Sequence, residues 1–373
     1  MNLRSFLFIL NIMFPLLIFS QERDSVMHSS LELDSIFNMT ELSVYARRAD
    51  EIVPSQRLGG KRLETLSTHS VADALRYFSG VQIKDYGGVG GLKTIDIRSM
   101  GANHMGVFYD GIQLGNAQNG LVDLGRFSLE NVEEIALYNG QKAQIFQPAR
   151  DFGTSGSVYI RTRRPRFKEG KAYNLRTSIK GGSFGLINPS LTWEQRWSRD
   201  ISSSLSADYT HATGKYEFRY RRVLPSGDVA WDTTAVRQNG DIHALRLEAS
   251  VLGNTHDGTW NAKAYYYDSE RGIPGAIVSN VWKHAQRQWD RNFFVQGQWT
   301  KHVSNRYKFQ VNGKYAIDHL RYLNPDTTLM YQDDRFLQQE LYLSTAHHVE
   351  ILPNADMRDL YQRLSEEICK RRS

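Results

Sequence analysis

The chain has 373 residues, a formal net charge of +6 and a mean hydropathy of -0.49, and this length accommodates one to three domains. The weak positive charge comes without a zinc-finger, RRM or helix-turn-helix pattern, so we expect no nucleic-acid partner. The apolar fraction of 40% is typical of soluble proteins, but it also fits a transmembrane β-barrel, whose strands turn every second residue to a polar lumen. The 19 Tyr and 7 Trp favour the barrel, because such rings suit a membrane–water interface.

Cysteine and histidine usage gives no sign of a metal centre or cofactor. Cys369 is the only cysteine, which excludes an internal disulfide and a cysteine metal cluster. The adjacent His347 and His348 would point to opposite faces of a strand, so we interpret them as a surface or lumen feature. We therefore expect neither a cofactor nor a metal site.

The N-terminus has the pattern of an export signal. Arg4 precedes an almost wholly apolar stretch, Phe6–Phe19, which is too short for a spanning helix of about 20 residues. It fits the apolar region of a secretory signal peptide over residues 1–20, with cleavage near Ser20. An uncleaved anchor is the alternative, and both interpretations predict export.

Residues 21–50 are polar and lack periodicity, so we expect a flexible segment. It contains one short β-prone run, made of Glu41, Leu42, Ser43, Val44, Tyr45 and Ala46. An isolated extended segment can add a strand to a partner's sheet edge. The alternative is an ordinary first strand of the domain that follows.

Residues 51–166 are predicted to form an α+β domain. Ser70 can cap a helix that reaches Phe78, with Val71, Leu75 and Phe78 on one apolar face and Gly80 just beyond its end. The glycines of 87–91 lack the features of a phosphate-binding loop, because neither Lys-Ser/Thr nor a helix-opening G-x-G-x-x-G is present.

The middle of this domain carries the most informative motif. Two alternating runs, Thr94–Arg98 and Gly106–Tyr109, surround a polar segment, and the second run enters Asp110-Gly111, a strong hairpin signal. The segment 130–140 and the run 153–162 follow as two further strands. In content and order these landmarks resemble the plug domain of TonB-dependent outer-membrane receptors. An unrelated small α/β domain is the alternative.

Two places depart from the family pattern. Ser99 stands where family members usually have glycine, and Gln147–Phe152 replaces a small, glycine-rich approach to the last strand. Both departures concern local turns and leave the plug resemblance unchanged.

The sequence period changes to two after the domain. Between Ile187 and Trp197 one face is mainly apolar and the other polar, and the same alternation recurs toward the C-terminus. We predict eight strands near 174–182, 185–197, 201–213, 239–252, 259–269, 287–303, 306–322 and 336–348. After the first hairpin the connections alternate between short and long, with the long ones at 214–238, 270–286 and 323–335. Short periplasmic turns and long extracellular loops are typical of a membrane barrel, whereas a soluble β-sandwich has no reason to segregate them.

The predicted fold is therefore an α+β plug domain followed by an incomplete antiparallel transmembrane β-barrel over residues 167–352. The resembled family builds 22-stranded barrels, and an eight-stranded barrel has no room for a plug. Residues 353–373 are charged, helix-like and without alternation. We expect a shortened receptor with a reading frame altered near Asn354–Met357; a small receptor with a C-terminal helix is the alternative.

The resemblance implies a transporter in the cell outer membrane, and not an enzyme; no Gly-x-Ser-x-Gly or His-Glu-x-x-His motif is present. Glu41–Ala46 takes the place of the TonB box, which implies TonB as the energy-coupling partner, with outer-membrane lipid and a surface lipoprotein as further partners. A plug protein that binds ligand or TonB without transport is the alternative.

The predicted ligand is a scarce small nutrient. Arg271–Gly275 and Gly101–His104 resemble segments of cobalamin-receptor-like members from Bacteroidetes-type bacteria, which implies cobalamin or another corrinoid; a ferric siderophore and an oligosaccharide stay open. Aromatic, amide and basic residues of the plug loops and the long loops are the candidate ligand-binding residues: Tyr86, Asn103, His104, Gln113, Asn116, Asn119, Tyr220, Arg222, Trp231 and Arg271.

Overall fold

The computed structural model describes residues 56–66, 68–115, 121–139, 153–277, 284–327 and 330–349. The chain divides into two compact units, Met1–Arg47 and Arg48–Ser373, and all described residues belong to the second. Four segments of the sequence analysis lie outside the described residues: the predicted signal peptide, the Glu41–Ala46 run, the departure at 147–152 and the tail from residue 353. No described helix is both long enough and apolar enough to cross a membrane.

The N-terminal domain is built on a mixed five-stranded sheet with the order β1-β6-β7-β4-β5. β7 pairs in parallel with β4 and antiparallel with β6, so the last strand of the domain closes the sheet between earlier ones. A separate hairpin joins β2 to β3. The strands are β1 (Gln56–Gly59), β2 (Val81–Asp85), β3 (Lys93–Ile97), β4 (Met105–Tyr109), β5 (Ile112–Leu114), β6 (Val132–Tyr138) and β7 (Gly156–Thr162).

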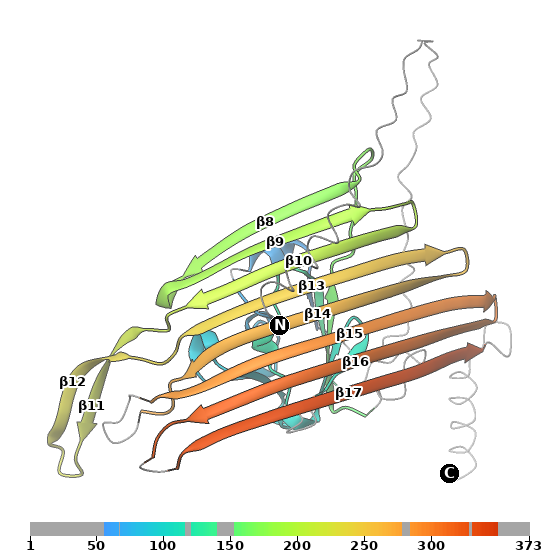
Figure 1. Cartoon of the computed structure of the whole chain (residues 1–373). Helices are drawn as coiled ribbons and strands as arrows, with labels where there is room; N and C mark the ends of the chain where they lie inside the picture. The colour runs from blue at the N-terminus through green and yellow to red at the C-terminus, as the bar shows by residue number, and fades with distance from the viewer. Residues whose placement is uncertain are drawn as a thin grey trace, which may run out of the picture. The chain divides into compact units, whose positions relative to one another are not determined.

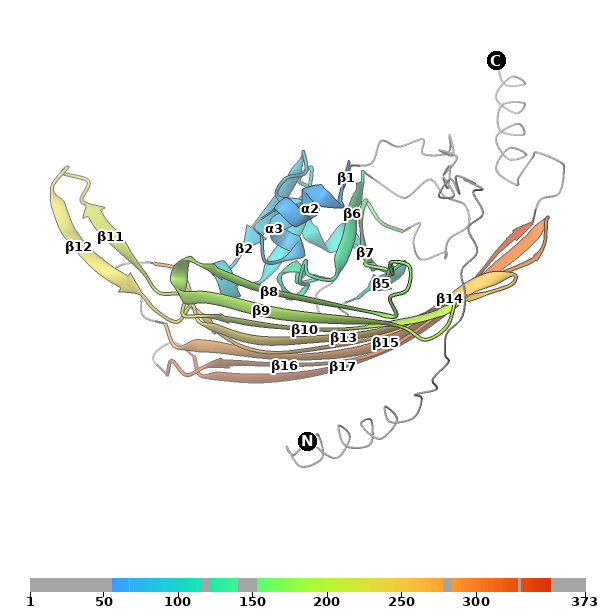
Figure 2. The same cartoon turned by 90° about the horizontal axis from the view of Figure 1, so that it is seen from above.

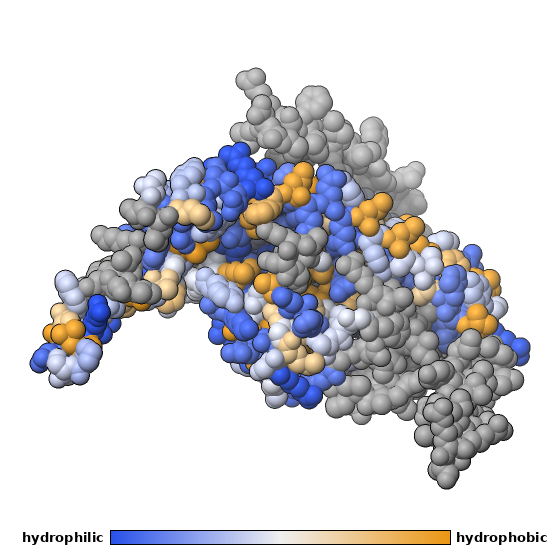
Figure 3. Space-filling view, turned by 90° about the horizontal axis from the view of Figure 1, so that it is seen from below, coloured by the Kyte–Doolittle hydropathy of each residue, from blue (hydrophilic) through white to orange (hydrophobic). Residues whose placement is uncertain are grey.

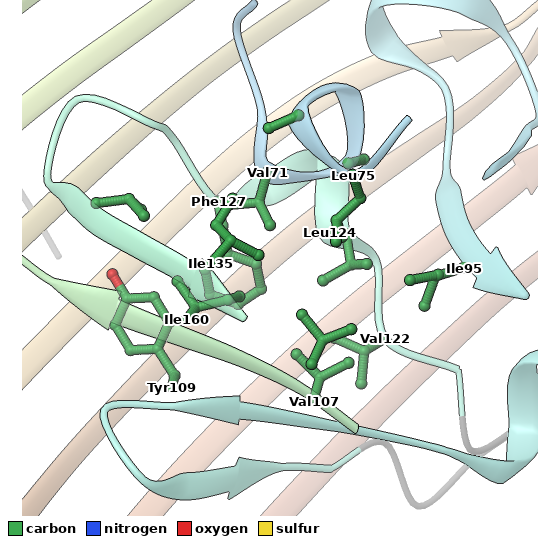
Figure 4. Close-up of a cluster of buried hydrophobic side chains, with 14 of the residues drawn as sticks. Val71, Leu75, Ile95, Val107, Tyr109, Val122, Leu124, Phe127, Ile135 and Ile160 are labelled. Atoms are coloured by element: carbon green, nitrogen blue, oxygen red, sulfur yellow. The ribbon is translucent and has the colours of Figure 1, made fainter. Parts of the chain in front are cut away.

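Two short helices, α2 (Lys61–Thr65) and α3 (Val71–Leu75), accompany this sheet. The Ser70 side chain caps α3 by accepting the Asp73 N–H, as predicted. Val71 and Leu75 are fully buried. They pack with side chains from the strands and from the 3-10 turn η4 (Leu124–Arg126) into one core (Figure 4). Val71 and Leu75 of the predicted apolar face therefore lie at the centre of the domain, but the helix ends at Leu75 and not at Phe78 as predicted.

Two tight turns carry positive φ angles. Asp110 (φ 48°) and Gly111 (φ 84°) connect β4 to β5, which confirms the predicted hairpin. Arg98 (φ 51°) and Ser99 (φ 58°) are also left-handed, and the Met100 N–H closes this turn onto the Ile97 carbonyl at 3.1 Å. The left-handed backbone explains why glycine suits position 99, since a Cβ atom is disfavoured there.

We expect Ser99→Gly to stabilise the N-terminal domain by about 1 kcal/mol, because it removes the Cβ strain of a left-handed residue. Hydrogen exchange of the β3 amides measures the change. Ser99→Ala is the control, since it keeps the Cβ atom and should bring no gain. Equal protection in the glycine and alanine variants would contradict the strain argument.

Eight antiparallel strands form the second sheet, in the order β17-β16-β15-β14-β13-β10-β9-β8 (Figure 1). β8 and β17 are its two edges, so the described strands form an open sheet rather than a closed barrel. All eight predicted strands are confirmed. They are β8 (Tyr173–Gly182), β9 (Leu186–Arg196), β10 (Ile201–Ala212), β13 (Ile242–Thr255), β14 (Gly258–Ile273), β15 (Gln286–Ser304), β16 (Tyr307–Asn324) and β17 (Gln332–Val349).

The two faces of this sheet differ as the alternation predicts. The face in contact with the N-terminal domain, called the inner face, is lined by buried polar residues, for example Ser204, Ser206 and Thr210 on β10. The other, outer face exposes large apolar side chains, and Figure 3 shows such residues on the outer side of the sheet, at the top of the view. They include Ile187, Leu191, Trp193, Leu205, Leu245, Val251, Phe293, Val295, Trp299, Tyr315, Leu341 and Leu343.

The connections correct two predictions. The stretch 214–238 is not a plain loop, because it contains a hairpin of β11 (Tyr216–Val223) and β12 (Val229–Arg237), which extends past the ends of β10 and β13 (Figure 2). Alternating aromatic residues favour strands here, and Gly227 (φ 88°) permits the tight turn between them. β14 also runs on to Ile273, although the sequence predicts a strand that ends near residue 269 and a loop from 270.

Candidate functional site: the plug on its polar wall

The N-terminal domain contacts the inner face of the eight-stranded sheet through buried charges on three neighbouring strands. We call this inner face the wall. We call Asp208 (β10), Arg246 and Glu248 (β13), and Lys263 and Arg271 (β14) the docking residues. All five are less than 9% exposed. A charge that is removed from water needs an opposite charge or several hydrogen bonds. The following contacts show that the domain supplies these partners.

Lys263 holds the turn between β4 and β5. Its ammonium lies 2.6 Å from Asp110 Oδ2 and 3.5 Å from Glu248 Oε2, and it donates to the Thr162 hydroxyl at 2.6 Å. Thr162 in turn donates its N–H and its hydroxyl to the Asp110 carboxylate, at 2.8 and 2.7 Å. One lysine therefore connects the wall to both a turn and the last strand of the domain.

Glu248 completes this cluster from the neighbouring strand. The Tyr109 hydroxyl donates to Glu248 Oε1 at 2.5 Å, and the Asn131 amide donates to Oε2 at 2.8 Å. Burial and the adjacent Glu248 carboxylate raise the pKa of Tyr109, which keeps the hydroxyl protonated as a donor. Burial alone would raise the pKa of Asp110, but Lys263 and the Thr162 donors hold it below its ordinary value.

Arg271 clamps two other turns of the domain. Its guanidinium donates to Asp123 Oδ2 at 3.0 Å and to the Gly90 carbonyl at 3.2 Å, and also pairs with Asp290 on β15 at 2.7 Å. Burial would raise the pKa of Asp123, but Arg271, Arg126 and the N–H groups of Lys93 and Gly125 lower it. The carboxylate of Asp123 is thus ionised and shared between the domain and the wall.

Arg246 grips the backbone of η4. It donates to the carbonyls of Arg126 at 2.7 Å and Gly125 at 3.3 Å, and its other nitrogen pairs with Asp208. The Tyr265 hydroxyl donates to the same Arg126 carbonyl at 2.8 Å. These contacts depend on backbone oxygens, so they require the η4 turn to keep its shape.

Contacts at both sides extend the docked area. Lys180 on β8 pairs with Glu130 at 2.5 Å, and Lys314 on β16 donates to the Gln113 carbonyl at 3.2 Å. The interface is thus broad, and it combines many separate polar links with an aromatic contact, in which Tyr109 and Phe127 of the domain pack against Tyr265 and Phe294 of the sheet. The polar links are separate from one another, so they can be broken one after another.

The depressed pKa values of Asp110 and Asp123 predict how docking depends on pH. A carboxyl whose folded pKa lies below the ordinary 3.8 contributes stability above that value and loses it as pH falls through the folded pKa. We expect hydrogen-exchange protection of β4 to stay constant from about pH 8 to about pH 5 and to fall below about pH 4. Loss of protection already near neutral pH would contradict this assignment.

The predicted ligand-binding residues of the domain lie in exposed turns. Tyr86 is 57% exposed, next to the glycine turn 87–91. Asn103 and His104 are exposed in the 3-10 turn η3 (Ala102–His104). Gln113 on β5 is half-buried, and its side-chain oxygen has no hydrogen-bond partner among the described atoms. Asn116 and Asn119 lie outside the described residues.

Arg271 occupies a different environment from the predicted one. The sequence placed it in a long loop, but it belongs to β14, is only 4% exposed and is held by two carboxylates. β14 continues to Ile273 because its residues pair with β15 up to the pair Ile273–Gln286. The guanidinium therefore links wall and domain in this structure.

Tyr220, Arg222 and Trp231 lie on the β11–β12 hairpin. Arg222 pairs with Trp231 across the two strands, so both side chains share a face with Tyr220. At the base of the hairpin, Arg237 donates to the Gly275 carbonyl just after β14. Pro274, which precedes Gly275, lies beside the glycine turn 87–91. A Cβ atom at Gly87 would lie 3.4 Å from Pro274 Cδ. The base of the hairpin and the glycine turn after Tyr86 thus both lie beside the segment 274–275.

Of the five docking residues, only Arg271 was among the predicted site residues, and it was predicted in a different role. Neither Lys263 nor Arg246 was singled out from the sequence. A signal was present, since each is a lone cation between apolar neighbours, Ala262/Ala264 and Leu245/Leu247. Among the described residues, no group of three or more His, Cys, Asp or Glu could hold a metal ion.

A model of the TonB-dependent Receptor Plug Domain matches residues 48–150. The N-terminal domain is therefore a plug domain, and the contacts above hold it on the inner face of an eight-stranded sheet. The plug and the sheet together are similar in structure to TonB-dependent receptors.

Three solved structures show this likeness. The copper transporter OprC has a TM-score of 0.60 and 14% identity, over 79% of this chain and 43% of OprC. The ferric-catecholate import receptor Fiu from E. coli K12 has a TM-score of 0.54 and 12% identity, over 83% and 48%. FpvA of P. aeruginosa, bound to a pyoverdine–iron complex, has a TM-score of 0.60 and 9% identity, over 83% and 41%. At these identities the likeness shows the fold, and this chain spans less than half the length of each structure.

Proposed function

We propose that this chain acts in TonB-dependent import of a scarce nutrient across the outer membrane. The observation that carries the proposal is the plug domain docked by separate polar links on the inner face of strands whose outer face is apolar. The apolar face suits lipid contact, and the separate polar links suit a gate that must be displaced. The similar structures are transport receptors by their titles, which supports transport rather than catalysis.

In the proposed mechanism, ligand binding outside favours one conformation of the plug, and TonB then captures the Glu41–Ala46 run and pulls. A ligand shifts the plug only as far as its affinities for the two conformations differ. The energy comes from TonB, because the sequence offers no nucleotide site. The extended run would add a strand to the TonB sheet, a mode that relies on backbone hydrogen bonds.

Capture by TonB is testable on the intact chain. We expect the C-terminal domain of TonB to bind the wild type, and Val44→Pro to weaken binding by roughly tenfold or more, because proline removes a backbone donor from the added strand. Ser30→Pro is the matched control, since it lies in the same segment but outside the run. Equal binding by all three chains would contradict the assignment of the TonB box.

For the ligand we propose a corrinoid such as cobalamin, on the resemblance of Arg271–Gly275 and Gly101–His104. Asn103 and His104 are exposed to a ligand, whereas Arg271 is held by Asp123 and Asp290. A ferric siderophore is the second candidate, because Fiu is titled a ferric-catecholate import receptor and FpvA binds a pyoverdine–iron complex. A surface lipoprotein partner belongs to the corrinoid proposal.

A titration of the chain in detergent micelles with cyanocobalamin, a ferric catecholate and ferric citrate separates these ligands. The corrinoid proposal predicts saturable binding of cyanocobalamin that His104→Ala weakens. Binding of the ferric catecholate alone would transfer the assignment to the siderophore class. Binding without TonB-dependent uptake into vesicles would favour a non-transporting binding protein.

A further inference from the structure

Two histidines face each other on the outer surface, where the alternation predicts apolar side chains. His211 is the penultimate residue of β10, His243 is the second residue of β13, and the two are directly paired in the strand register. Their rings are tilted with centroids 4.5 Å apart, and the two Nδ1 atoms are 3.3 Å apart. The Tyr209 hydroxyl lies 3.1 Å from His243 Nδ1. None of these residues belongs to the plug interface.

We propose that His211 and His243 form a binding site for a divalent late transition-metal ion. Imidazole nitrogen is a preferred ligand of copper, zinc and nickel. With metal–nitrogen bonds of about 2.05 Å, two nitrogens 3.3 Å apart subtend about 107° at the metal, close to the tetrahedral angle. The two rings are thus spaced for chelation without movement of either strand.

The two carboxylates nearest in sequence register, Glu270 and Asp241, are the groups to consider as further ligands of the metal. Glu270 on β14 is the register partner of His243, but its carboxylate is bound by Arg287 at 2.8 Å, as is that of Asp241 at 2.9 Å. Neither carboxylate is therefore free to act as a third ligand, in agreement with the lack of a group of three or more His, Cys, Asp or Glu among the described residues. The site offers two imidazoles, with water in the remaining positions. Such a site should prefer Cu²⁺ over Ni²⁺ and Zn²⁺.

A metal here would also have a structural consequence. The β11–β12 hairpin leaves the sheet between β10 and β13, so His211 and His243 stand on either side of its base. A bound ion would cross-link these two strands at that point. This inference rests on the paired histidines alone and does not depend on the proposed transport function.

The test is a Cu²⁺ titration of the full chain in detergent micelles, followed by electron paramagnetic resonance. The variants are His211→Gln and His243→Gln. His319→Gln is the matched control, because His319 is an exposed histidine of β16 on the same sheet. We expect the wild type and His319→Gln to hold a copper ion with two nitrogen ligands. Either test variant should lose about 100-fold in affinity, as expected when one arm of a chelate is removed.

A second measurement guards against misfolded variants. Cu²⁺ should raise the thermal unfolding midpoint of the wild type and of His319→Gln, but not that of a test variant with the wild-type far-UV circular dichroism spectrum. The competing explanation is a simple hydrogen bond between the two rings. Copper binding that is equal in all four proteins, or lost equally in His319→Gln, would overturn the metal site.

Discussion

Lys263→Met is expected to weaken plug docking by about 3–5 kcal/mol, because it leaves Asp110 and Glu248 as buried carboxylates without their cation. Methionine keeps most of the side-chain volume, so the loss reports charge rather than a cavity. Hydrogen exchange of the β4 and β7 amides measures the effect, and exchange should accelerate roughly hundredfold or more at pH 7.

Lys215→Met is the control for this substitution, because Lys215 is exposed just before β11. It should leave exchange unchanged. In the double variant Lys263→Met/Asp110→Asn the loss should be smaller than in Lys263→Met alone, because one of the two stranded charges is gone. Additive losses in the double variant would contradict a direct Lys263–Asp110 interaction.

Arg271→Leu is expected to have an effect of similar size, about 3–5 kcal/mol, for a related reason. The substitution leaves Asp123 facing Asp290 without the guanidinium between them, and it removes the donor to the Gly90 carbonyl. Protection should fall in the glycine turn and in η4 before it falls in β6. Hydrogen exchange followed by mass spectrometry of peptides measures the order in which these segments lose protection.

Arg291→Leu is the matched control for Arg271. Arg291 also pairs with an aspartate, Asp268, at 3.0 Å, but on the exposed outer face one strand away. An exposed pair contributes little, so docking should change by no more than about 0.5 kcal/mol. If the two arginine variants behave alike, burial does not determine the strength of these links.

The sequence predicts the strands well because one face of each contacts an apolar surrounding and the other a polar one. Apolar and polar residues therefore alternate along each strand. On β10, for example, Leu205 is exposed on the outer face and Ser206 is buried on the inner face. Turn chemistry is equally local, and Asp110-Gly111 therefore predicts its hairpin.

The docking contacts could not be predicted in the same way. Asp110 and Lys263 are far apart in the chain, and so are Asp123 and Arg271, and nothing local indicates which cation meets which carboxylate. Arg271 illustrates the limit: glycine and proline after it suggest a loop, but pairing with β15 extends the strand past it. The β11–β12 hairpin was missed because its turn, Leu224–Asp228, lacks a two-residue hairpin signal.

The central claim is that the plug is a gate held by separable polar links and released by a pull from its N-terminal side. Single-molecule force spectroscopy tests it, with the TonB C-terminal domain on the probe and the full chain in a lipid bilayer. The account predicts that pulling extends the plug by up to roughly 3.4 Å per residue while the eight-stranded sheet stays folded, and that Lys263→Met lowers the force required. Detachment of TonB without any extension, or unfolding of the sheet before the plug, would contradict it.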